Sequence, residues 1–158
     1  MKHTFLLVLL MGSLAVSAQS SRYTEAMTKQ TSDLDSSSTF TPESLQQKSN
    51  TFEQIADAEK TQWLPYYYAA YTQIMQAFML KDKTQADPLS DKAAANLDKA
   101  EALSPKNSEI ACLRSLVASA KLMVDPANRG AQYGPEAAAQ LAAAKSYNPE
   151  NPRVYLLE

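Results

Sequence analysis

The same pattern occurs twice: residues 93–113 read AAANLDKAEALSPKNSEIACL, and residues 137–157 read AAAQLAAAKSYNPENPRVYLL. Shifted by 44 residues, the two stretches agree at 8 of 21 positions. Alanine alone inflates such a score, but the Leu, Pro and Asn matches keep the register of the alanines. The sequence therefore contains an internal repeat, which is typical of folds that stack one structural unit on the next.

Each copy has the spacing of a helix that ends before a proline. A small residue is followed after four positions by Leu, after three more by another small residue, and after five more by Pro. Steps of four and three place side chains on one helix face. The small residues let a neighbouring helix approach, and proline ends the helix because it cannot donate the next backbone hydrogen bond. The predicted repeat-packing residues are Ala93, Leu97, Ala100 and Pro105, and in the second copy Ala137, Leu141, Ala144 and Pro149.

An asparagine follows each of these prolines by two residues. Asn107 and Asn151 stand where the N-caps of the next helices belong, so the predicted unit is a helical hairpin that stacks on its neighbours. The apolar residues 154–157 begin another helix, and the sequence stops at Glu158. Because so short a helix without a partner leaves its side chains exposed, we expect this sequence to be a C-terminally truncated form of a longer protein.

Two more helices are predicted upstream of the repeat. Pro42 suits a first helical turn, with Thr41 or Ser44 as the cap. The next helix begins just before Pro65, since proline is tolerated in the first turn, and the polar stretch Lys81–Pro88 breaks it. Its buried side is predicted from a stripe of residues spaced three or four apart: Trp63, Tyr67, Tyr71, Ile74 and Phe78.

The first 18 residues have the layout of a cleaved signal peptide. Lys2 and His3 form a short basic start, Phe5–Met11 is apolar throughout, and small residues at 16–18 suit cleavage. The apolar run is shorter than the roughly 20 residues that cross a bilayer, and no later apolar segment comes close to that length. We therefore predict an exported protein, periplasmic or secreted, with no transmembrane segment.

Three parts of the chain are expected from these patterns. Residues 1–18 are the predicted signal peptide. Residues 19–41 form a polar segment, with one weak helix at about Arg22–Leu34. Residues 42–158 form an all-α helical repeat domain.

The composition excludes several classes of function. Removing residues 1–18 removes His3, the only histidine, and leaves 14 Lys and Arg against 17 Asp and Glu. Ser-His-Asp catalysis, Cys-His catalysis and His-based metal sites are thereby excluded. The basic residues do not cluster, so nucleic acid is not a predicted partner. We predict no enzymatic activity, no cofactor and no metal.

Other reactive side chains have plainer explanations. Cys112 stands among apolar neighbours, which favours a buried small hydrophobe over a reactive thiol. The segment 125–128 (DPAN) lacks the ligand density of a calcium loop and is predicted to form a turn. Carboxylates at helical spacing favour a solvated face over an acid/base pair: Glu53, Asp57, Glu59, Asp98 and Glu101.

The repeat resembles the second helix of a tetratricopeptide repeat (TPR). Residues 52–60, 63–70, 123–126 and 151–155 are similar to exported, TPR-like envelope proteins of Gram-negative bacteria. The resemblance covers roughly residues 42–158 and implies stacked antiparallel helix pairs, a TPR-like α-solenoid whose concave surface binds another protein. The period of 44 exceeds the usual 34 residues. The surplus is predicted to lie in a loop around Asp125–Gly134.

Two functions remain open. The leading prediction is a non-enzymatic scaffold in the periplasm or cell envelope that holds another protein or peptide; neither that partner nor the oligomeric state is specified by the sequence. The alternative is a module that binds a glycan or peptide, because Tyr and Trp combine apolar area with a polar group. Its candidate surface is Trp63, Tyr66, Tyr67, Tyr68 and Tyr71, with Tyr133 in the predicted loop beside Arg129 as a further candidate.

Overall fold

The computed structural model describes residues 21–32, 34 and 40–158. Over these residues the chain is helical and contains no strand, which confirms the all-α prediction. It divides into two units, Met1–Ser37 and Ser38–Glu158. In the first unit residues 21–31 are helical, within the polar segment where a weak helix was expected. The predicted signal peptide lies outside the described residues.

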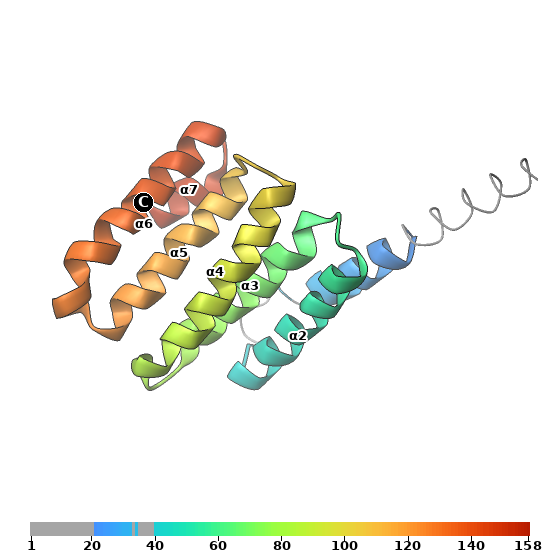
Figure 1. The fold of residues 1–158 in the computed structure, drawn as a ribbon, viewed down its shortest axis with the longest axis horizontal. Coiled ribbons are helices and arrows are strands. Elements are labelled where there is room, and N and C mark those ends of the chain that lie inside the picture. Colours follow the sequence, from blue (N-terminus) through green and yellow to red (C-terminus); the bar gives the residue numbers. More distant parts are fainter. Residues whose placement is uncertain (1–20, 33, 35–39) are drawn as a thin grey trace, which may run out of the picture. The chain divides into compact units, whose positions relative to one another are not determined.

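The second unit is a row of antiparallel helices, each packed on the one before it (Figure 1). This arrangement confirms the predicted stacking of sequential antiparallel pairs. The short α7 contacts α5 and α6. Among the described residues, no helix combines the length and apolar content needed to cross a membrane. The elements are α2 (Pro42–Ala58), α3 (Trp63–Met79), the 3-10 turn η2 (Lys83–Gln85), α4 (Ala86–Leu103), α5 (Ser108–Val124), α6 (Pro126–Tyr147) and α7 (Pro152–Leu157).

The helices begin where the local signals place them. Thr41 and Ser44 form a reciprocal capping box on α2, with backbone-to-hydroxyl distances of 2.9 and 3.1 Å. Asn107 caps α5 and Asn151 caps α7, and each side-chain oxygen accepts from the backbone N–H two residues on, at 2.9 Å. Pro65 lies in the first turn of α3, as expected.

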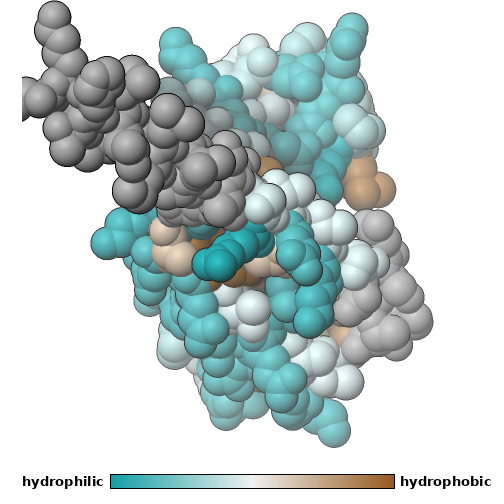
Figure 2. Space-filling model, turned by 90° about the vertical axis from the view of Figure 1, so that its right-hand side faces the viewer, coloured by the Kyte–Doolittle hydropathy of each residue, from teal (hydrophilic) through white to brown (hydrophobic). Residues whose placement is uncertain are grey.

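The apolar core lies between α2 and α5. Its largest fully buried apolar side chains come from four helices in turn: Leu45, Phe52, Ile74, Leu97, Ile110 and Leu113. On the face drawn in Figure 2, the coloured part is mostly hydrophilic, and hydrophobic residues show only as small separate patches. The burial of large apolar side chains therefore drives the packing of α2 to α5.

A polar cluster crosses this core and links three helices. Gln73 of α3 donates to Ser49 at 2.8 Å and to Glu53 at 3.0 Å, both on α2. Asn96 of α4 donates to the same Glu53 oxygen at 3.0 Å and to Gln73 at 3.2 Å, while Lys92 pairs with the other Glu53 oxygen at 2.8 Å. These satisfied partners fix the register of α2, α3 and α4.

The predicted loop at Asp125–Gly134 is wrong, because α6 runs without a break through Gly130, Gly134 and Pro135. Asp125 is the N-cap of this helix, and its carboxylate accepts from the backbone N–H of Asn128 at 3.2 Å. Two glycines and a proline indicated a loop, but packing along α5 overrides these local preferences.

The predicted break at Lys81–Pro88 is longer than the one observed. Residues 83–85 form η2, and α4 already begins at Ala86. Pro88 therefore lies in the first turn of α4, where its missing N–H costs nothing.

We expect a Pro135→Ala variant to be more stable than the wild type by about 1–2 kcal/mol. Pro135 lies inside α6, where it removes one helical hydrogen bond and crowds the preceding turn. Urea unfolding followed by circular dichroism measures the change. Pro126→Ala is the matched control, because Pro126 stands at the first position of the same helix and costs little there. Equal shifts for the two variants would contradict a strained helix interior.

Candidate ligand-binding cavity

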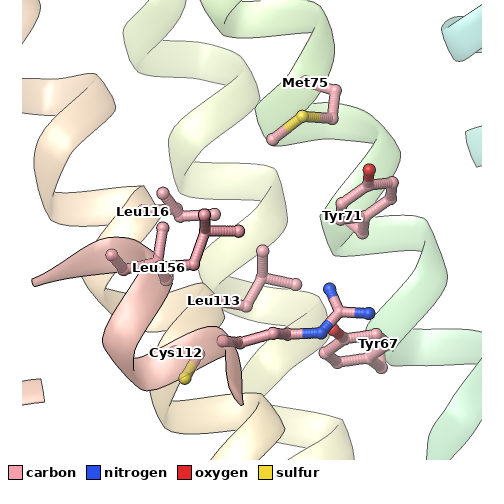
Figure 3. Close-up of a pocket in the computed structure, with 9 residues that line it drawn as sticks. Tyr67, Tyr71, Met75, Cys112, Leu113, Leu116 and Leu156 are labelled. Atoms are coloured by element: carbon pink, nitrogen blue, oxygen red, sulfur yellow. The ribbon is translucent and has the colours of Figure 1, made fainter. Parts of the chain in front are cut away.

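A cavity of about 190 Å³ lies between α3, α5 and α7 (Figure 3). Its lining is mostly apolar and includes two tyrosines, one cysteine and one arginine. On α3 the lining residues are four positions apart, so they share one helix face. The residues are Tyr67, Tyr71 and Met75 of α3, Cys112, Leu113 and Leu116 of α5, and Arg153, Leu156 and Leu157 of α7.

The Glu109 carboxylate forms the polar end of this region. The hydroxyl of Tyr67 donates to its Oε2 at 3.0 Å, and Nε of Arg153 lies 2.8 Å from the same oxygen. Asn151 donates to the other oxygen, Oε1, at 2.9 Å. Since these partners belong to α3 and to the start of α7, one carboxylate of α5 holds all three walls together.

The short α7 is anchored in two further ways. Val154 is fully buried and packs in a small apolar cluster with Ala144 and residues of α5. Asn151 also donates to the hydroxyl of Ser108 at 2.9 Å, and that hydroxyl donates to the Ala144 carbonyl at 2.9 Å. These contacts seat α7 although six residues are too few for a helix to be stable alone.

The Tyr67 phenol and the Cys112 thiol of the cavity are both protonated at neutral pH. Burial raises the pKa of the Tyr67 phenol far above its ordinary value; the charge of Arg153 lowers this pKa, and the Glu109 carboxylate raises it. Burial also raises the pKa of the Cys112 thiol to about 11. Neither group therefore carries a charge. The predicted burial of Cys112 is confirmed, since its exposed fraction is 2%.

The predicted aromatic surface is divided by the structure. Tyr67 and Tyr71 line the cavity. Tyr66 is buried, and its hydroxyl donates to the Ala56 carbonyl at 3.3 Å. Tyr68 stacks on a phenylalanine of α2 with ring centroids 5.4 Å apart. Only part of the aromatic cluster therefore faces a space that a ligand can enter.

The remaining predicted residues lie away from the cavity lining. Tyr133 lies on α6 instead of in a loop, with the Lys121 ammonium 5.9 Å from its ring centroid. Trp63 packs edge-on against Tyr67 at 5.7 Å between centroids. In the first repeat copy Ala93, Leu97 and Ala100 are fully buried on α4, whereas in the second Ala144 is buried and Ala137 and Leu141 are half-buried on α6. Pro105 and Pro149 stand in the turns after these two helices.

Sequence reasoning missed most of the cavity wall. The stripe of α3 contained Tyr67 and Tyr71, and continuing it by four residues reaches Met75. The α5 residues Leu113 and Leu116 read as ordinary core. No periodicity or motif pointed to Arg153, which reaches the site through the seating of α7. Among the described residues, no cluster of three or more His, Cys, Asp or Glu side chains is arranged to hold a metal ion.

One solved structure is similar to this chain over most of its length. It is the HusA haemophore from Porphyromonas gingivalis, with a TM-score of 0.76 and 41% sequence identity. The match covers 85% of this chain and 65% of that protein, so the chain spans less than two thirds of its length. No protein-family model and no curated protein matches the chain.

The similarity bears on three sequence-based predictions. The similar protein is named a haemophore, that is, a haem-binding protein. This agrees with the prediction of a non-enzymatic protein. The similarity favours the ligand-binding alternative over the protein scaffold. The resemblance to TPR proteins is not confirmed by it. The stacking of antiparallel helices is confirmed by the structure itself.

Proposed function

We propose that this chain binds haem, or a tetrapyrrole of that shape, in the cavity between α3, α5 and α7. The observation that carries the proposal is an apolar cavity with a single polar end in a chain 41% identical to a haemophore. A tetrapyrrole has two large apolar faces and a polar edge where its acid side chains attach. Leucines, a methionine and tyrosine rings suit the faces, and the end near Arg153 suits the edge.

The size of the cavity determines how much of such a ligand it can enclose. Its volume of about 190 Å³ is below the range of ~300–1,000 Å³ that is usual for small-molecule sites. One part of the macrocycle therefore fills the cavity while the rest extends beyond it. At this margin Leu156 lines the cavity and is 83% exposed, so it is free to cover the projecting part. Covering that apolar side chain adds favourable burial to the complex.

The donor atoms of the cavity favour binding through the ring faces. The Tyr67 phenol is protonated and already donates to Glu109, and the Cys112 thiol is protonated. Met75 supplies a neutral thioether, which is a weak hydrogen-bond acceptor. These groups hold the ring by apolar and aromatic contact, and a bond to the iron is not needed for affinity.

We therefore expect haem and metal-free protoporphyrin IX to bind with affinities within a few-fold of each other. Trp63, the only tryptophan, lies beside the cavity residue Tyr67, so quenching of its fluorescence reports binding. Both ligands should give saturable curves with one site per chain. Binding of haem alone would contradict the ring-face mode, and saturable binding of neither would overturn the proposed function.

The other predicted functions stay predictions. The scaffold that holds another protein or peptide has no observation that favours it over tetrapyrrole binding. The glycan module has lost part of its proposed surface, because Tyr66 is buried. Export to the periplasm or beyond also remains a prediction from residues 1–18.

A further inference from the structure

Arg153 presents unused donors to the cavity. Of the described residues that line the cavity, it alone carries a charge, and its side chain is 50% exposed. Its Nε pairs with Glu109 at 2.8 Å. Arginine also carries N–H donors on both terminal nitrogens. Among residues 21–32, 34 and 40–158, these two nitrogens make no hydrogen bond.

The Glu109 carboxylate fixes this arginine without using up its attraction for anions. Glu109 also accepts from Tyr67 and Asn151, so its negative charge is shared among three donors. The pairing through Nε orients the guanidinium plane and leaves its outer edge available. That edge matches a carboxylate, which it binds with two parallel hydrogen bonds. Tyr67 and Cys112 are neutral, so neither opposes an anion there.

We infer that Arg153 recognises a carboxylate of the bound ligand through its terminal nitrogens, so that the cavity selects tetrapyrroles that carry acid side chains. This inference rests on the proposed function and adds a ligand class and an orientation to it. The ring faces contact the apolar walls and supply most of the affinity. The acid edge lies toward α7, and Arg153 supplies the selectivity.

The test compares protoporphyrin IX with its dimethyl ester, in which both carboxylates are masked. The wild type should bind the acid roughly tenfold more tightly than the ester, the size expected for one charge-assisted hydrogen-bonded pair. Arg153→Gln should bring the acid-to-ester ratio close to one. Arg153→Lys should keep part of the ratio, since it retains the charge but loses the planar fork.

The ratio is measured within each variant, so a loosened α7 lowers the affinity for both ligands and leaves the comparison intact. Lys145→Gln is the matched control, because Lys145 pairs with Glu158 at 2.7 Å and does not line the cavity. This control should keep the wild-type ratio.

Three other results would contradict the inference. Equal binding of acid and ester by the wild type overturns it and leaves the proposed function standing. An acid-to-ester ratio that stays at the wild-type value in both Arg153 variants overturns it as well, because another group then recognises the carboxylates. Binding of neither ligand overturns the inference together with the proposed function.

Discussion

A Met75→Glu variant is expected to bind haem and metal-free protoporphyrin IX at least about 30-fold more weakly than the wild type. Met75 lies on α3, is half-buried and forms part of the apolar wall of the cavity. A carboxylate at this position is solvated in the free protein and loses water when a ring covers it. Leaving such a group without a partner costs at least about 2–3 kcal/mol, which is a 30- to 100-fold change in affinity.

Met79→Glu is the matched control for this prediction. Met79 lies four residues further along the same helix, is 41% exposed and does not line the cavity. The same chemical change there should leave both affinities within about twofold of wild type, because Met79 is exposed to water and outside the cavity lining, where a charge stays solvated and screened. Trp63 quenching measures binding, and thermal unfolding checks that both variants are folded. Equal losses in the two variants would place the ligand elsewhere.

Much of the fold was predictable because its signals are local. The N-caps at Asn107 and Asn151 and the entry of Pro65 into α3 depend on a few neighbouring residues, and all three are confirmed. The helix at Pro126–Tyr147 was not predictable in this way. Its glycines and proline favour a loop locally, and only the length of contact with α5 makes the helix continuous.

The cavity could not be predicted because it joins residues that are distant in sequence. Tyr67 and Tyr66 are adjacent members of one aromatic run and look alike in the sequence. Their roles differ because the Tyr66 hydroxyl donates to the Ala56 carbonyl of α2, while the Tyr67 hydroxyl donates to the Glu109 carboxylate of α5. Arg153 becomes a cavity residue only once α7 is seated against α5. Such pairings depend on tertiary packing, which the spacing of apolar residues along one helix does not predict.

The internal repeat predicts equal roles for Leu97 and Leu141, but the structure predicts unequal costs for removing them. Leu97 is fully buried on α4, between α3 and α5. We expect Leu97→Ala to lower the free energy of unfolding by about 2–5 kcal/mol, the usual cost of a cavity in a packed core. Leu141 is half-buried on α6, whose described neighbours are α5 and α7. Leu141→Ala should cost only about 1 kcal/mol, since its surroundings are partly water.

Urea unfolding of both variants, followed by circular dichroism, measures this difference. The substitution is the same and both leucines sit in the same repeat pattern, so each variant is the control for the other. Equal and large losses would contradict the partial exposure of Leu141. They would mean that another surface covers the outer side of α6 in solution, because only burial on that side raises the cost of losing this leucine.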